Sequence, residues 1–316
     1  MTAGTTTRAF VFHGPGRGSI QDWDVRAAEV VVDVEACALC QREHQVWNGS
    51  IERSLPDVLG HEMVGRVVRA PAASGFERGS RVAGMGNYAL AERTAVPAWQ
   101  ITPLDGPYRP QDALVEPLAC AVNATREASS ISGPGVTAVV VGLGLLGQLI
   151  GELWAAAHGP VVGVDHDLDR LALATRAGMQ GIALGGDEEP LDEIVARASV
   201  AFECSGDAGM IERVSRLLPA GSVLAIVAHH RGHDIATGRL LDLWHSRGVK
   251  VWNAVPRTSR SMAECVRAAG YLVHSGRVDL GRFGVRCFSL GDTPRALRAW
   301  PAGDVFRNVI VIGADR

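Results

Sequence analysis

The sequence is almost devoid of lysine and carries no excess of positive charge. Lys250 is the only lysine among 31 basic residues, and the formal net charge is −3 at pH 7. Arginine supplies the rest of the positive charge, which we attribute to the base composition of the genome. A general nucleic-acid-binding surface would need a clustered basic excess. We therefore expect no nucleic-acid partner.

The sequence also lacks the segments that direct a chain into a membrane. It shows no signal peptide, which would have a charged start, an apolar run and a small-residue cleavage site. The stretch 136–157 is mostly apolar, but four glycines, Gln148 and Glu152 interrupt it. A buried strand that runs into a helix explains this stretch better than a membrane span. We expect no membrane partner and a cytoplasmic protein.

The six cysteines do not have the spacing of a structural zinc site. In a reducing cytoplasm they are expected to be free or metal-bound rather than paired in disulfides. Cys37 and Cys40 form one C-x-x-C, but no second such pair exists, so a four-cysteine site cannot be assembled locally. A catalytic zinc, with about three protein ligands and an open position, remains compatible with the sequence.

The pattern of apolar residues predicts two domains of different type. In the first third, short valine-rich strands with glycine between them predict an all-β, barrel-like region; they are 9–12, 29–35, 63–68, 81–83 and 91–96. The middle third alternates strands and helices, which predicts a doubly wound parallel sheet; the strands are 136–141, 161–164, 200–202, 223–227 and 249–255, and two of the helices are 145–158 and 168–177. The mixed last part, with a helix at 262–275 and strands at 283–288 and 309–312, is expected to fold back onto the first domain.

A glycine-rich turn follows the first buried strand of the middle third. Its G-x-G-x-x-G pattern comprises Gly142, Gly144, Leu145, Leu146 and Gly147. The pattern indicates a dinucleotide site because a strand precedes it and a helix follows it. The first glycine allows the tight turn, the second lets the backbone approach a pyrophosphate, and the third permits close packing of helix on strand. We therefore predict a Rossmann dinucleotide site.

Two further turns are candidates for cofactor contacts. Asp165 ends the next strand, where a carboxylate can bind the adenosine ribose and repel a 2′-phosphate, so NAD is favoured over NADP. The nearby His166 and Arg170 leave NADP as an alternative cofactor. The alternative role of Asp165 is to cap the next helix. Cys204, Ser205 and Gly206 follow another parallel strand and either contact the cofactor or form a simple turn.

Four side chains of the first domain are of the types that bind zinc. Cys40, His61, Glu62 and Glu116 offer thiolate, imidazole and carboxylate groups. A lone cysteine or histidine is more often a packing residue, so residue types alone leave this site as one suggestion among several.

The sequence around these residues resembles a known family. VEACALC at 34–40 is followed by LGHEMVG at 59–65, GSRV at 79–82, ALVEPLAC at 113–120 and then the glycine-rich turn. This order resembles the zinc-containing medium-chain dehydrogenase/reductase family, which includes the alcohol dehydrogenases. The segment 113–120 is similar to that of sorbitol and threonine dehydrogenases. The resemblance covers nearly the whole chain.

The resemblance implies an α/β architecture in which a β-rich GroES-like catalytic domain, 1–118 with 257–316, accompanies a Rossmann domain, 119–256. It implies that Cys40 and His61 bind a catalytic zinc, with Glu62 and Glu116 beside the metal as direct ligands or as holders of its water. It places Arg307 near the cofactor pyrophosphate, although a solvated arginine is an equal alternative. A homodimer or homotetramer is the habit of the family.

The chain departs from the family at the second zinc and at the proton relay. Segment 84–92 lacks the clustered cysteines of the structural zinc lobe, so one zinc per chain is expected. Arg42 stands where the family often has a serine or threonine that relays the alcohol proton, and an arginine has no proton to give at working pH. Glu43 and His44 are candidates for a rebuilt relay. Arg42 contacts an anionic or polyhydroxylated substrate or pairs with a carboxylate such as Glu43.

The function that follows is hydride transfer between NAD(H) and a small secondary alcohol, polyol or amino-alcohol, with zinc as the Lewis acid. Two alternatives stay open. One is a zinc-free NAD(P)H-dependent reductase of the same superfamily. The other is a non-catalytic NAD-binding protein.

Overall fold

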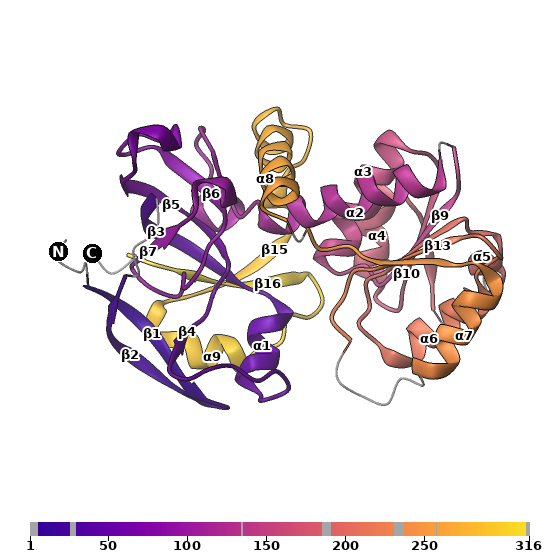
Figure 1. Cartoon of the computed structure of the whole chain (residues 1–316), viewed down its shortest axis with the longest axis horizontal. Coiled ribbons are helices and arrows are strands. Elements are labelled where there is room, and N and C mark those ends of the chain that lie inside the picture. Colours follow the sequence, from indigo (N-terminus) through magenta and orange to yellow (C-terminus); the bar gives the residue numbers. More distant parts are fainter. Residues whose placement is uncertain are drawn as a thin grey trace. The chain divides into compact units, whose positions relative to one another are not determined.

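The computed structural model describes residues 6–25, 30–133, 135–184, 191–230, 237–256 and 258–313. The chain folds into two compact units, one formed by residues 1–119 with 257–316 and the other by residues 120–256. In Figure 1 the first unit carries both the indigo start and the yellow end of the chain. The sequence placed the first boundary one residue earlier, after residue 118.

The first unit is built on two antiparallel-rich sheets. A three-stranded sheet has the order β2-β1-β4, and a seven-stranded sheet has the order β15-β16-β3-β5-β6-β8 with β7 paired to β3. The strands are β1 (Thr6–Gly14), β2 (Arg17–Asp24), β3 (Val30–Leu39), β4 (Asp57–Val58), β5 (Glu62–Arg69), β6 (Arg81–Met85), β7 (Arg93–Val96), β8 (Ile101–Pro103), β15 (Gly284–Phe288) and β16 (Val305–Val311). This is the β-rich domain that the sequence predicted.

Strand β3 lies in the interior of the large sheet and leads directly into Cys40. Its valines suit a pleated surface, and it pairs with β5, β7 and β16. The last strand, β16, pairs with β3 antiparallel, with Ile310 opposite Cys37. The end of the chain therefore returns to the first domain, as expected from the sequence.

Two short helices, one longer helix and several 3-10 turns complete the first unit. They are α1 (Gln41–Trp47), α8 (Ser259–His274) and α9 (Thr293–Arg298), with 3-10 turns η1 (Ala72–Ser74), η2 (Ala98–Gln100), η3 (Pro110–Asp112), η4 (Leu280–Arg282) and η5 (Leu290–Asp292). Helix α1 was not predicted, because seven residues between a strand and a turn give too short a periodic pattern. It begins directly after Cys40, so a helix start fixes the backbone of that residue.

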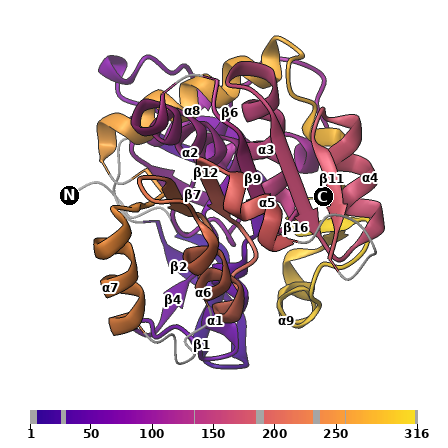
Figure 2. The ribbon, with the colours of Figure 1, turned by 90° about the vertical axis from the view of Figure 1, so that its right-hand side faces the viewer.

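The second unit is a doubly wound parallel sheet. Its six strands have the order β11-β10-β9-β12-β13-β14, with β9 (Ala138–Val141), β10 (Val161–Asp165), β11 (Gln180–Ala183), β12 (Val200–Glu203), β13 (Val223–Ile226) and β14 (Lys250–Asn253). The helices are α2 (Glu116–Ser132), which begins in the first unit, α3 (Leu145–Ala157), α4 (Leu168–Arg176), α5 (Leu191–Arg197), α6 (Ala208–Leu217) and α7 (Thr237–Arg247). Helices α3 and α4 pack together, as do α5, α6 and α7, and the two groups cover opposite faces of the sheet (Figures 1 and 2).

The strand order places a topological switch point between β9 and β12. From β9 the chain winds outward through β10 and β11, then returns to β12 on the other side of β9. In open α/β sheets, ligands bind outside the carboxyl ends of the strands at this point.

The sequence patterns missed β2, β4, β8 and β11. The exposed strand β2 lies at a sheet edge and buries few side chains, so it lacks an apolar rhythm. The expected strand 29–35 begins in the structure at Val30, and Glu29 lies outside the described residues. Among the described residues, no helix has the length and apolar character to span a bilayer.

Candidate metal centre and dinucleotide site

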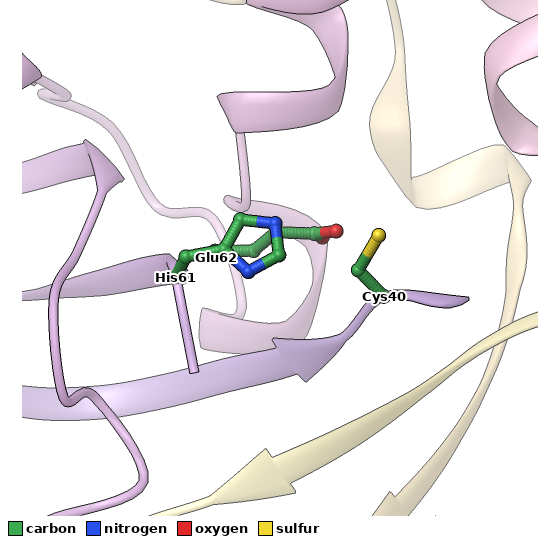
Figure 3. Close-up of side chains that lie close together, drawn as sticks. All are labelled: Cys40, His61 and Glu62. Atoms are coloured by element: carbon green, nitrogen blue, oxygen red, sulfur yellow. The ribbon is translucent and has the colours of Figure 1, made fainter. Parts of the chain in front are cut away.

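Three of the four predicted zinc ligands converge in the first unit. One ligand atom each of Cys40, His61 and Glu62 lies within 4.8 Å of the others. Figure 3 shows the sulfur of Cys40 and the carboxylate of Glu62 pointing toward one another, with the His61 ring beside them. Cys40 follows β3, and Glu62 begins β5, which pairs with β3. The pairing of two neighbouring strands therefore brings together groups that are some twenty residues apart.

A single carboxylate, that of Glu43, orients two of these groups. Its Oε1 lies 2.7 Å from Nδ1 of His61, and its Oε2 accepts a hydrogen bond of 3.1 Å from the backbone N–H of Cys40. Glu43 is 4 % exposed. With Nδ1 engaged by the carboxylate, Nε2 of His61 is the nitrogen left to bind a metal, which is the usual arrangement of a metal-binding histidine. Glu43 is therefore a positioning residue.

Glu62 and Glu116 concentrate negative charge at the centre. Both are 5 % exposed. Burial, together with the charge of Glu116, raises the pKa of Glu62 to about 7. Oε2 of Glu62 is buried and has no hydrogen-bond partner among the described residues. A buried carboxylate oxygen without a hydrogen-bond donor is stabilised by a cation.

Burial and His61 act in opposite directions on the other ionisable groups. Burial raises the pKa of the Cys40 thiol, and His61 lowers it only in part. Burial also raises the pKa of Glu43, but His61 outweighs this effect, so the pKa lies below its usual value. For His61, burial lowers the pKa and Glu43 raises it, with a net result well above the ordinary value. The His61–Glu43 pair is therefore favoured in its charged form.

Arg307 lies beneath this centre rather than on the surface. It is 3 % exposed, and its Nη1 is 3.8 Å from Oε2 of Glu62. The guanidinium also donates to the carbonyls of Gln111 and Leu114, each at 3.4 Å. Burial lowers its pKa, and Glu62 counteracts that shift. The alternative of a solvated arginine is therefore wrong, because β16 places this side chain in the interior. Contact with a pyrophosphate stays a prediction.

Arg42, Glu43 and His44, near the start of α1, have different surroundings. Arg42 is exposed, and its charge lowers the pKa of Glu43. His44 is 5 % exposed, with Nδ1 2.8 Å from the carbonyl oxygen of Leu297 and its ring edge against Trp300. The proposed relay role of Glu43 and His44 is not supported by these contacts, since Glu43 holds ligands and His44 packs α1 against α9.

The donor set fits zinc. A thiolate, an imidazole and a carboxylate are all zinc ligands, and three protein ligands are the number found in catalytic sites. Oε2 of Glu62 accepts no hydrogen bond among the described residues and has Arg307 3.8 Å away. Together with the carboxylate behind His61, it agrees with a cation at this point. Cys37 of the C-x-x-C is fully buried and lies outside this group.

We expect Glu43→Gln to weaken zinc binding by about 10–100-fold, the usual cost of losing the partner of a metal-binding histidine. The carboxylate accepts hydrogen bonds through two oxygens, one from His61 and one from the Cys40 backbone. An amide has one oxygen and must turn its NH₂ group toward one of those N–H donors. Competition with a chromophoric chelator measures the affinity. Glu52→Gln, at an exposed position of the same unit, is the control. Unchanged affinity in Glu43→Gln would contradict this role.

The glycine-rich turn lies at the carboxyl end of β9 in the second unit. Gly142 has φ +91°, and a Cβ there would come within 2.7 Å of the backbone nitrogen of Ser205. A Cβ on Gly147 would lie 2.0 Å from the carbonyl oxygen of Gly142. Gly144 has an ordinary φ of −64°, and a Cβ added to it would meet no atom within 4 Å. The fold therefore explains the first and third glycines, and a ligand that approaches the backbone explains the second. Leu145 and Leu146 begin α3 directly after it.

Asp165 holds the turn from the end of β10. Its Oδ2 accepts a 2.6 Å hydrogen bond from the backbone N–H of Leu143, and its Oδ1 accepts one of 3.0 Å from that of Asp167. Asp167, rather than Asp165, caps helix α4. Nε of Arg170 lies 3.8 Å from Oδ2 of Asp167. Because Asp165 is not the cap, that alternative is wrong, and its carboxylate lies beside the glycine-rich turn.

The segment Cys204–Gly206 packs directly against the same turn. The backbone N–H of Cys204 donates to the carbonyl of Val141 at 2.8 Å, and Gly206 has φ +69°. The sequence left open whether these residues contact a cofactor, and their place at the switch point is compatible with it.

Comparisons with known proteins match part of the first unit by sequence and the whole chain by fold. Residues 26–106 match the model of the alcohol dehydrogenase GroES-like domain. A protein of Neosartorya fischeri named Probable D-xylulose reductase A is 29% identical over 217 residues, which cover 55% of this chain and 60% of that protein. The matched segment therefore spans less than two thirds of that relative.

Two solved structures share the whole architecture. A Sinorhizobium meliloti protein described as a zinc-binding dehydrogenase and bound to NADP superposes with a TM-score of 0.80 at 21% identity, covering 97% of this chain and 99% of that one. L-idonate 5-dehydrogenase of Escherichia coli gives 0.79 at 19% identity, covering 97% and 98%. At these sequence identities the likeness shows a shared fold. The match to the GroES-like domain spans Cys40, His61 and Glu62.

Proposed function

We propose that this protein is a zinc-dependent oxidoreductase of the medium-chain dehydrogenase/reductase family, which transfers a hydride between NAD(H) and a secondary alcohol, a polyol or an amino-alcohol. The observation that carries the proposal is the convergence of Cys40, His61 and Glu62, with the His61 ring held by Glu43. The names of the relatives, a D-xylulose reductase and an L-idonate dehydrogenase, favour polyhydroxylated substrates.

The residues of the first unit would hold the metal and balance its charge. Cys40, His61 and Glu62 would be the ligands. Bound zinc would supply a Lewis acid for the substrate oxygen. Glu43 keeps the His61 ring in the tautomer that offers Nε2. Arg307, 3.8 Å from Glu62, offsets the negative charge of the buried carboxylate. Glu116 would act beside the metal.

The second unit would bind the dinucleotide, which supplies the hydride acceptor and donor. The glycine-rich turn and the start of α3 would hold the pyrophosphate. The carboxylates of Asp165 and Asp167 at the end of β10 would repel a 2′-phosphate bound there, and this supports NAD in the proposal. The NADP in the Sinorhizobium meliloti structure and Arg170 of this chain make the comparison of the two cofactors part of the test.

Arg42 is suited to a polar or anionic part of the substrate. It is exposed, follows a predicted zinc ligand by two residues and carries a permanent charge. The proposal therefore places sugar acids and polyols ahead of simple alcohols. A homodimer or homotetramer stays a prediction from family habit.

A screen of polyols, amino-alcohols and cyclitols by NADH absorbance tests the function. We expect turnover with at least one substrate, loss of that activity with a chelator, and its return when zinc is restored. NAD should exceed NADP in kcat/KM by at least about tenfold, or roughly 1.4 kcal/mol of transition-state stabilisation.

Two outcomes of the same screen would contradict the proposal. Turnover by protein free of metal would point to a zinc-free reductase. NADH binding without turnover of any substrate would point to a non-catalytic NAD-binding protein.

A further inference from the structure

A buried carboxylate ends the strand beside the switch point. Glu203 is the last residue of β12 and has no exposed surface. Its Oε1 accepts hydrogen bonds from the backbone N–H of Ser205 at 2.9 Å and from the Ser205 hydroxyl. Its other oxygen, Oε2, lies 2.7 Å from Nε2 of His230. The carboxylate thus orders both the turn after β12 and a histidine beyond β13.

The contact favours one neutral tautomer of His230. A carboxylate oxygen offers only lone pairs, and at 2.7 Å an unprotonated ring nitrogen would repel it. The two atoms are close without the geometry of a hydrogen bond. In the favoured tautomer Nε2 carries the proton, and Nδ1 is a hydrogen-bond acceptor. The side chain of His230 is 11% exposed, so the ring is held in place while part of it remains accessible.

This pair stands on the second half of the dinucleotide-binding sheet. In a sheet of this strand order, each half binds one mononucleotide across the switch point. Asp165, at the end of β10, marks the adenosine half. Glu203 and His230 follow β12 and β13, on the opposite side of β9. Ser205, which Glu203 orders, packs against Gly142 of the glycine-rich turn.

We propose that Nδ1 of His230 accepts a hydrogen bond from the nicotinamide half of NAD(H), and that Glu203 is the residue that positions it. The donor on the cofactor is a ribose hydroxyl or the carboxamide NH₂. The inference rests on the proposed dinucleotide site. It adds a contact that the glycine-rich pattern does not contain.

Binding without turnover tests this contact. NADH affinity is measured by fluorescence and ADP-ribose affinity by calorimetry, because ADP-ribose lacks the nicotinamide ring and its carboxamide. We expect His230→Ala to raise the Kd for NADH by about tenfold, which corresponds to roughly 1.4 kcal/mol and to the loss of one hydrogen bond. The Kd for ADP-ribose should rise by at most about threefold. His245→Ala, on α7 of the same unit, should change neither.

A second variant keeps the histidine and changes its tautomer. In Glu203→Gln the oxygen can still accept from Ser205, but the NH₂ group faces Nε2 of His230. The ring proton then moves to Nδ1, which becomes a donor. The affinity for NADH should therefore fall as it does in His230→Ala. The 3-acetylpyridine analogue of NAD, which has a methyl group in place of the NH₂, identifies the donor. Sensitivity of that analogue to His230→Ala assigns the ribose hydroxyl, and insensitivity assigns the carboxamide.

The possible failures are distinguishable. If the unsubstituted protein binds neither NADH nor ADP-ribose, the dinucleotide site itself is wrong, and this inference with it. If it binds both and the two variants bind NADH normally, the contact alone is wrong. Equal losses for NADH and ADP-ribose would also overturn it, because they would indicate a purely structural pair.

Discussion

Cys40→Ser is expected to abolish turnover while NADH still binds. Serine is a poor zinc ligand at neutral pH, because the metal prefers the thiolate among the ligands that a short side chain can offer. Loss of the Lewis acid removes several kcal/mol of transition-state stabilisation, so kcat should fall by about 10³-fold or more. Zinc content by atomic absorption and NADH affinity by fluorescence are measured on the same sample.

Cys287→Ser is the matched control, because Cys287 is an exposed thiol on β15 of the same unit. It should retain both zinc and activity. A Cys40→Ser protein that turns over substrate at the normal rate would refute the metal mechanism. A variant that loses NADH binding as well would show that the substitution damages more than the metal centre.

Gly147→Ala is expected to remove dinucleotide binding and to lower the stability of the second unit. The added methyl group would lie 2.0 Å from the carbonyl oxygen of Gly142, so the turn or helix α3 must move. Overpacking of this kind costs about 1–3 kcal/mol of folding free energy. Displacement of the turn should raise the Kd for NADH by about 10²-fold, which corresponds to roughly 2.7 kcal/mol. Thermal unfolding and fluorescence titration measure the two effects.

Substitutions at two other glycines of this unit distinguish an effect on folding stability from an effect on NADH binding. In Gly144→Ala the added methyl group meets no atom of the protein within 4 Å, so the unfolding temperature should not change. The affinity for NADH should fall, because the methyl group would lie where the pyrophosphate approaches the backbone. Gly238→Ala, on α7, also meets nothing and should change neither property. Normal NADH binding by Gly144→Ala would contradict the assignment of the turn to a pyrophosphate.

The residues that converge at the candidate metal centre could be predicted because short stretches of sequence carry them. Cys40 and His61 lie in segments whose residue order is specific, and each follows or precedes a strand whose position the valine pattern shows. The parallel sheet was predictable for a similar reason. Strands buried on both faces appear as continuous apolar runs, and the helices between them are long enough to show their period.

The roles of Glu43 and Arg307 could not be obtained in the same way. The spacing of three residues between Cys40 and Glu43 is that of a helix start, and it could have indicated the backbone contact. Its second contact, with His61, depends on strand pairing. The approach of Arg307 to Glu62 joins positions more than two hundred residues apart, and no local pattern encodes such a contact. The same holds for Glu203 and His230, which follow different strands.

The pairing of β16 with β3 makes the first unit discontinuous along the chain. A fragment that stops after residue 119 would leave the 36–39 edge of β3 without its partner strand and Glu62 without the guanidinium of Arg307. During synthesis the second unit precedes β16, so Glu62 acquires the neighbouring charge of Arg307 only after that unit has been made. Loss of β16 would therefore disturb residues that precede it by more than two hundred positions.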